Sequence, residues 1–313
     1  MRTVESRIAA RCRRAGIAAA LLAASTLVGC GSGGATGQVV RDVAYARDSR
    51  SQALDLYLPA RAGGDALPLV IYIHGGGWEH GDKSQIDSAA GADIKAFRDS
   101  LLAAGYAVAA INYRLTGEAI WPAQIHDVKA AVRYLSTHAA RYHLDAGRFA
   151  AFGGSAGGHL VALLSTTHGE PSMEGAVGTS DGSSVIEAAV SFFGAYDLPT
   201  MQPQAAARCG SAYGEVGQSK LIGGPLTEAP YAELAADASP VNHVDSGDAP
   251  LLLLHGTKDC VVAHDQADEM LAQLEAAGVP SGLISLDVGH SDPAFFTDED
   301  VVDQVLTFLD EHI

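Results

Sequence analysis

Short apolar runs alternate along this chain with longer segments in which apolar residues recur every three or four positions. Short continuous runs are typical of strands buried on both faces, and the longer spacing is typical of helices that bury one face. The predicted strands are Val39–Ala46, Ala53–Leu58, Leu69–His74, Ala107–Asn112, Phe149–Phe152, Ala188–Phe193, Leu251–His255 and Leu283–Asp287. The predicted helices include Ile125–Ala140, Ala156–Thr166, His264–Ala277 and Asp298–Glu311.

This alternation favours an α/β fold, with a mostly parallel eight-stranded sheet covered by helices on both faces, over residues 39–313. The stretch 198–247 breaks the rhythm, because it is rich in Ala, Gly, Pro and acidic residues and favours short helices. We interpret it as an excursion over the sheet edge. Three roles stay open for it: a lid, a part of the substrate pocket or a surface cover.

The first thirty residues have a different pattern. A start with five arginines precedes the apolar run Ile17–Val28, which is too short to span a bilayer comfortably. The run leads to Leu-Val-Gly-Cys ending at Cys30, which resembles a bacterial lipobox. We therefore expect residues 1–30 to be a lipoprotein-type signal peptide with lipidation at Cys30, and 31–38 to be a flexible linker. This predicts an exported, membrane-anchored protein of the cell envelope; an ordinary signal peptide and a periplasmic or secreted protein are the alternative.

The net charge limits which molecules the chain can bind, and the number of cysteines limits which disulfide it can form. The formal net charge of −17 argues against nucleic acid and polyanionic substrates, and is compatible with a neutral small molecule. Outside the first thirty residues only Cys209 and Cys260 remain. Two cysteines in an oxidising compartment can pair, so we predict a Cys209–Cys260 disulfide, with two free thiols as the alternative.

One motif carries nucleophile chemistry: Gly153-Gly154-Ser155-Ala156-Gly157, a G-x-S-x-G sequence between a predicted strand and a predicted helix. A nucleophile on a tight strand-to-helix turn forces the flanking backbone into close contact, so its neighbours must be small. The helix N-terminus favours developing negative charge. The motif alone also occurs by chance in Gly-rich loops, but this setting favours Ser155 as a nucleophile.

A second Gly-rich segment, His74-Gly75-Gly76-Gly77-Trp78, follows another predicted strand. Acyl transfer places negative charge on the former carbonyl oxygen, and backbone N–H donors must reach it without intervening side chains. We therefore predict an oxyanion hole from Gly75, Gly76, Gly77 and Ala156. A plain turn or a phosphate loop is the alternative, and the phosphate loop is disfavoured because no Gly-Lys-Ser/Thr follows.

Together these motifs resemble an α/β-hydrolase of the HGGG esterase type, over nearly the whole of residues 39–313. Within that fold the chain is most similar to the bacterial branch of carboxylesterases and acetyl-xylan and feruloyl esterases. The other segments that carry the similarity are Gly81-Asp82-Lys83, Asn112-Tyr113-Arg114-Leu115, Trp121-Pro122-Ala123-Gln124 with Asp127-Val128, Ala238-Ser239-Pro240 and His255-Gly256-Thr257. Two positions depart from the pattern: Gly154 stands where a Glu is frequent, and Ser291-Asp292 follow His290 in place of a further Gly or His.

The resemblance implies a triad in the order Ser, Asp, His. Asp259, after the strand Leu251–His255, is the position it assigns to the carboxylate, with Asp197 as a rival. His290, between the last predicted strand and the last helix, is the expected general base. Such chemistry needs no metal or organic cofactor, and the sequence shows no metal-ligand spacing.

We thus predict a serine carboxylic-ester hydrolase that works through an acyl-enzyme on small or carbohydrate-linked esters of the acetyl or feruloyl type. Trp78, Tyr113, Phe193 and Tyr196 are candidate pocket residues, with packing in the core as the alternative. An arylformamidase-like or other amide hydrolase is the main alternative function, and a non-catalytic binding protein on the same fold is a further one.

Overall fold

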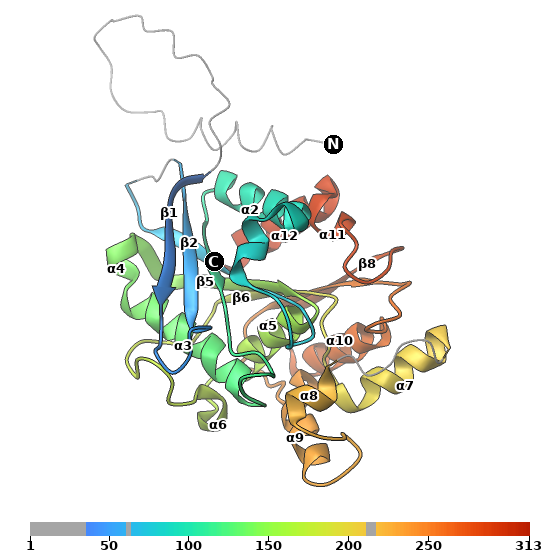
Figure 1. Ribbon diagram of the computed structural model, residues 1–313. Coiled ribbons are helices and arrows are strands. Elements are labelled where there is room, and N and C mark those ends of the chain that lie inside the picture. The colour runs from blue at the N-terminus through green and yellow to red at the C-terminus, as the bar shows by residue number, and fades with distance from the viewer. Residues whose placement is uncertain (1–35, 61–63, 211–216) are drawn as a thin grey trace, which may run out of the picture.

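The computed structural model describes residues 36–60, 64–210 and 217–313. Its eight strands form one sheet in the order β1-β2-β4-β3-β5-β6-β7-β8 (Figure 1). The strands are β1 (Thr36–Ala44), β2 (Ala53–Pro59), β3 (Leu67–Ile73), β4 (Ala107–Ile111), β5 (Leu144–Gly154), β6 (Ala188–Phe192), β7 (Leu251–Gly256) and β8 (Ser281–Leu286). β2 pairs antiparallel with β1 and β4, and all other neighbours are parallel. The predicted α/β fold and mostly parallel sheet are confirmed.

The helices between the strands are α2 (Ala92–Ala103), α3 (Ala123–Thr137), α4 (Ala139–Tyr142), α5 (Ala156–Thr166), α6 (Pro171–Glu174), α7 (Leu198–Cys209), α8 (Gln218–Ile222), α9 (Tyr231–Asp237), α10 (Asp265–Ala277), α11 (Ala294–Thr297) and α12 (Glu299–His312). Short 3-10 helices are η1 (Lys83–Asp87), η2 (Ala89–Gly91) and η3 (Pro240–Asn242). None of the helices in the described ranges combines the length and hydrophobicity that a bilayer span requires.

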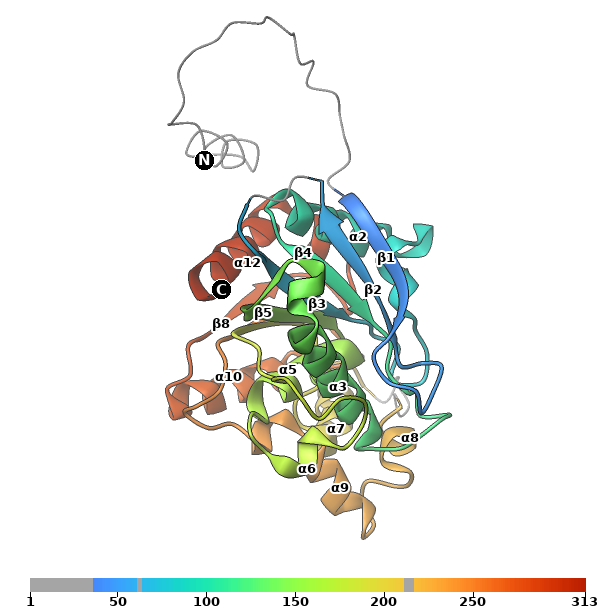
Figure 2. The same ribbon diagram turned by 90° about the vertical axis from the view of Figure 1, so that its left-hand side faces the viewer.

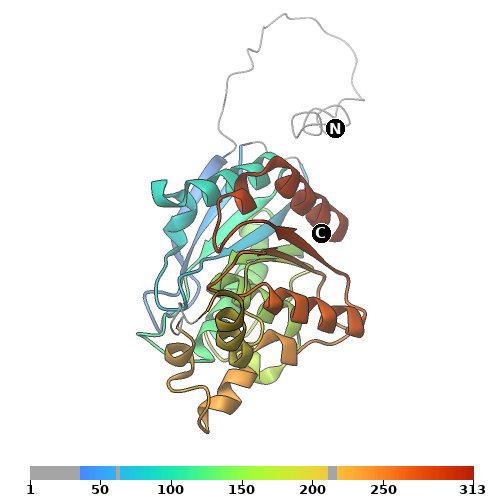
Figure 3. The same ribbon diagram turned by 90° about the vertical axis from the view of Figure 1, so that its right-hand side faces the viewer.

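Each face of the sheet has its own core. Successive side chains of a strand point to opposite faces, and in β3 Leu69, Ile71 and Ile73 join one cluster while Val70 and Tyr72 join the other. The first cluster is covered by α3, α5 and α10, and the second by α2, α11 and α12 (Figures 2 and 3). Because both of their faces are buried, the central strands β3, β4, β6 and β7 are almost wholly apolar instead of alternating with polar residues.

The segment 198–247 forms short helices in its described part, as the composition predicts. Helices α7, α8 and α9 lie together on the side of the sheet that carries α10 (Figure 1). A disulfide joins Cys209 at the end of α7 to Cys260 in the loop after β7, with Cα atoms 5.8 Å apart. The predicted pairing is confirmed, and it fastens the excursion to the loop that carries Asp259.

Two corrections concern the elements. β1 already begins at Thr36, so the last three residues of the expected linker 31–38 belong to the sheet. Helix α2 was not predicted, because its apolar positions Phe97, Leu101 and Leu102 have helical spacing but are interspersed with charged residues. The expected signal peptide 1–30 and the lipidation site Cys30 lie outside the described residues.

Candidate active site

Ser155 stands at the turn between β5 and α5, with φ 57° and ψ −122°. This is a rare conformation for a residue with a side chain, and the surrounding backbone has to hold it. A Cβ at Gly153 would lie 2.5 Å from the carbonyl oxygen of Ile73, and one at Gly157 would lie 2.1 Å from the same atom. The motif therefore needs glycine on both sides because the end of β3 passes directly against the turn.

The structure brings the three predicted catalytic residues into one hydrogen-bonded line. His290 Nε2 lies 3.0 Å from Ser155 Oγ, and His290 Nδ1 lies 2.6 Å from Asp259 Oδ2. Asp259 follows β7 and His290 follows β8, so both reach Ser155 from the carboxyl end of the sheet. The rival Asp197 is the N-cap residue of α7, and its N–H donates to Gln266 Oε1 at 2.8 Å.

Backbone and side-chain donors fix the charge on Asp259. Its Oδ1 accepts hydrogen bonds from the N–H groups of Val261 and Val262, at 2.8 and 2.9 Å. Burial alone would raise the pKa of Asp259, but hydrogen bonds from His255 and His290 outweigh burial and hold the pKa below its ordinary value. As a carboxylate, Asp259 accepts the Nδ1–H of His290. The Nε2 of His290 is then free to take the proton of Ser155.

The predicted oxyanion loop lies beside Ser155. Gly76 and Gly77 have φ angles of 114° and 61°, and Gly75 fits because a Cβ there would lie 2.7 Å from the carbonyl oxygen of Gly154. Within the described ranges the N–H groups of Gly76 and Gly77 donate to no protein acceptor. Ala156 opens α5, where the first N–H groups have no partner inside the helix. The donors needed to bind an oxyanion are therefore available.

A cavity of about 480 Å³ opens onto Ser155 and His290. The oxyanion glycines line it together with apolar side chains and a few polar ones. The apolar residues are Tyr72, Ala90, Ile94, Phe193, Val261 and Phe296, and the polar ones are Gln85, Asp93 and Ser291. Only Phe193 among these residues was predicted from the sequence. The similarity segment Gly81-Asp82-Lys83, whose last residue begins η1, was the available signal for Gln85.

Three of the four aromatic residues predicted for the pocket belong to the core instead. These three are Trp78, Tyr113 and Tyr196, and each is at most 2% exposed. Trp78 donates to His159 Nδ1 at 3.0 Å, and Tyr113 donates to the carbonyl of His74 at 3.0 Å. The hydroxyl of Tyr196 lies 2.7 Å from Ser191 Oγ. These polar ends find partners inside the protein, so nothing directs the rings toward the cavity.

Phe193 gives a structural reason for the unusual Gly154. A Cβ at position 154 would lie 2.8 Å from two ring carbons of Phe193, so a larger residue before the nucleophile would displace this ring. The ring packs edge to face on His290, with centroids 4.9 Å apart. Phe193 itself has φ 40°, which turns its side chain toward the catalytic line. Phe193 thus fills the space that a side chain at position 154 would need.

No cluster of three or more His, Cys, Asp or Glu side chains in residues 36–60, 64–210 and 217–313 is arranged to hold a metal ion.

Residues 54–274 match the protein family described as BD-FAE. The chain is 29% identical to esterase LipC of Mycobacterium tuberculosis over 229 residues, which is 73% of this chain and 53% of that protein. It spans about half the length of the curated relatives that it matches over most of its own length.

Two solved structures are similar over a large part of the chain. A truncated form of a carbohydrate esterase from gut microbiota is 32% identical, with a TM-score of 0.75, 89% of this chain covered and 97% of that one. The bifunctional GH43-CE of Bacteroides eggerthii is 31% identical, with a TM-score of 0.76, 87% of this chain covered and 38% of that one. Sequence and fold are both similar to those of esterases.

Proposed function

The chain belongs to the BD-FAE family of α/β-hydrolase esterases, and from this premise we propose that it hydrolyses carboxylic esters through an acyl-enzyme on Ser155. One observation carries the proposal: Ser155, His290 and Asp259 form a continuous hydrogen-bonded line at the wall of an open cavity. The oxyanion glycines line the same cavity.

The proposed mechanism uses each of these groups once per half-reaction. Ser155 Oγ attacks the ester carbonyl while His290 Nε2 takes the hydroxyl proton, and Asp259 stabilises the imidazolium. N–H groups of Gly76, Gly77 and Ala156 hold the oxyanion. His290 then gives its proton to the departing alcohol, which leaves an acyl group on Ser155. Water, deprotonated by His290, releases the acid and restores the serine.

We propose esters on small alcohols or carbohydrates, with acetyl or feruloyl acyl groups, as the substrates. The similarity to a carbohydrate esterase and to a bifunctional GH43-CE supports the carbohydrate part. The cavity supports it too, because apolar side chains can hold an acyl group while Gln85, Asp93 and Ser291 offer hydrogen bonds. The negative net charge favours neutral substrates.

We also propose that the protein is exported and attached to a membrane through a lipidated Cys30. The basic start, the short apolar run and the Leu-Val-Gly-Cys sequence support this. The Cys209–Cys260 disulfide supports export as well, because such bonds persist in oxidising compartments.

The test is the Ser155→Ala variant with p-nitrophenyl acetate as substrate. We expect kcat to fall by about 10⁴-fold or more, because the residual rate then comes only from binding and the oxyanion hole. Ser291→Ala is the matched control, since Ser291 lines the same cavity outside the hydrogen-bonded line. It should stay within a few-fold of the wild type, and unchanged turnover by Ser155→Ala would refute the proposal. A panel of acetyl, butyryl and feruloyl esters with an aryl formamide then separates ester from amide hydrolysis.

A further inference from the structure

Two polar side chains share the cavity with Ser155 but belong to no part of the proposed catalytic line. Gln85 comes from η1 and Asp93 from the first turn of α2, and both line the cavity and are half-buried. Within the described part of the chain, neither the Gln85 amide nor the Asp93 carboxylate makes a hydrogen bond to another side chain or to the backbone. Their hydrogen-bonding capacity is thus open to a substrate.

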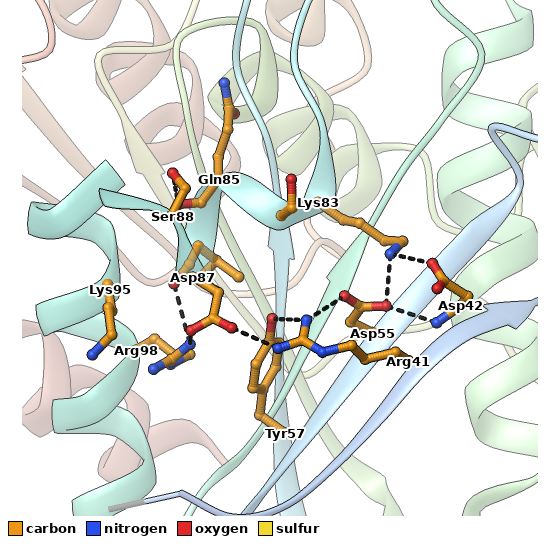
Figure 4. A network of polar contacts seen from close by, with 12 residues as sticks. Arg41, Asp42, Asp55, Tyr57, Lys83, Gln85, Asp87, Ser88, Lys95 and Arg98 are labelled. Carbon is orange, nitrogen blue, oxygen red and sulfur yellow. Dashed lines mark hydrogen bonds and ion pairs between the residues drawn. The ribbon is translucent and has the colours of Figure 1, made fainter. Parts of the chain in front are cut away.

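Lys83, two positions before Gln85, is held by two carboxylates (Figure 4). The Lys83 ammonium lies 2.7 Å from Asp42 Oδ1 and 2.7 Å from Asp55 Oδ1, and its side chain is only 9% exposed. Hydrogen bonds and charges from Asp42 and Asp55 overcome the opposing effect of burial and raise the pKa of Lys83. A charged lysine at this depth fixes η1 to β1 and β2.

Asp87, two positions after Gln85, is held by two arginines (Figure 4). Asp87 binds Arg41 through Oδ2 and Arg98 through Oδ1, each at 2.6 Å. Arg98 also donates to the carbonyl of Ile86 at 3.3 Å and lies over the ring of Tyr57. Solvent screening and desolvation limit the net stability that such exposed and partly buried ion pairs provide, so we attribute to this network a role in positioning η1.

The backbone of Gln85 itself is held, while its side chain is not. Its N–H donates to the carbonyl of Asp82 at 2.9 Å, and its carbonyl accepts from the N–H and the hydroxyl of Ser88 at 3.3 and 3.2 Å. A Cβ at Gly91 would lie 2.2 Å from that carbonyl, so η2 packs closely on it. Figure 4 shows the Gln85 side chain pointing away from the ion-pair network. The amide is therefore presented from a rigid base, which lowers the entropic cost of binding.

We propose that Gln85 and Asp93 determine specificity by binding hydroxyl groups on the alcohol half of a carbohydrate ester. This inference rests on the proposed function and names the residues that would select its substrate. A sugar hydroxyl both donates and accepts; the Gln85 amide can match either role, and the Asp93 carboxylate accepts. The same carboxylate disfavours anionic substrates, because like charges repel within a partly desolvated cavity.

The test compares two acetyl esters that differ in the leaving alcohol. p-Nitrophenyl acetate has no hydroxyl group to bind, whereas monoacetylated methyl xyloside keeps its free sugar hydroxyls. Gln85→Leu should raise KM for the xyloside by about 2- to 12-fold, the range for the loss of one uncharged hydrogen bond. With p-nitrophenyl acetate, kcat/KM should stay within about twofold of the wild type. Asp93→Asn should shift the same selectivity in the same direction.

Gln273→Leu is the matched control, because Gln273 is exposed on α10 and does not line the cavity. An equal loss on both substrates would overturn the proposal in favour of a structural role for Gln85. An unchanged KM for the xyloside would overturn it as well. If the wild type cleaves p-nitrophenyl acetate but not the xyloside, the hydroxyl-binding proposal fails and the esterase proposal stands. If it cleaves neither ester, the proposed function fails.

Discussion

The disulfide between Cys209 and Cys260 should contribute a large share of the stability of this domain. The two cysteines are 51 positions apart, and the loop they close contains α8, α9 and β7. For a loop of this length the chain-entropy model predicts a stabilisation of about 4 kcal/mol at 25 °C. In a domain of this size each kcal/mol corresponds to about 2–4 °C in Tm. Replacing both cysteines by serine should therefore lower Tm by roughly 8–16 °C.

The assay is thermal unfolding of the oxidised wild type, the reduced wild type and the Cys209→Ser/Cys260→Ser variant. The reduced protein and the double variant should behave alike. Activity at 25 °C should persist in both, because the N–H groups of Val261 and Val262 continue to hold Asp259. If the double variant unfolds within about 2 °C of the oxidised wild type, the disulfide does not stabilise the domain by restricting the unfolded chain.

Three further substitutions test the catalytic triad, the packing of Phe193 on Gly154 and the burial of Asp248. Asp259→Asn should lower kcat by about 10³- to 10⁴-fold without unfolding the protein, because no carboxylate then holds His290 in the tautomer that accepts the Ser155 proton. A loss of less than tenfold in steady-state kinetics would contradict the triad. Gly154→Ala should lower the free energy of unfolding by about 1–3 kcal/mol, because the new Cβ clashes with Phe193. Adding Phe193→Leu should restore part of this loss. If urea unfolding shows that the two effects are strictly additive, the clash is not the cause. Burial raises the pKa of Asp248 to about 7, so the folded state binds its proton more tightly than the unfolded chain and stability falls as pH rises from about 4 through 7. Asp248→Asn should remove that loss, adding about 1–3 kcal/mol at pH 8 and little at pH 4; equal gains at both pH values would be inconsistent with this.

The sheet and the catalytic line could be predicted because their signals are local. A strand buried on both faces is a nearly continuous apolar run, as β3, β4, β6 and β7 are, and each of the eight predicted strands overlaps an observed one. The turn at Ser155 needs glycine at fixed positions next to the end of β3, which leaves a motif that can be recognised in sequence. The order of Asp259 and His290 then follows from the resemblance to the α/β-hydrolase fold.

The cavity walls could not be predicted in this way, because they come from residues far apart in the chain. Phe193 and Tyr196 are only three positions apart at the end of β6, yet one lines the cavity and the other is buried against Ser191. The difference depends on a positive φ at Phe193 and on a partner for the Tyr196 hydroxyl, and neither has a local sequence pattern. Gln85 was missed because its surroundings depend on ion pairs between β1, β2, η1 and α2.

Labelling with a fluorophosphonate, followed by peptide mass spectrometry, tests whether Ser155 forms the covalent intermediate. We expect a single adduct on the peptide that contains Ser155. The adduct should be absent from Ser155→Ala and form more slowly in Asp259→Asn. An adduct on another residue such as Ser291, or no adduct on a protein that hydrolyses p-nitrophenyl acetate, would contradict it.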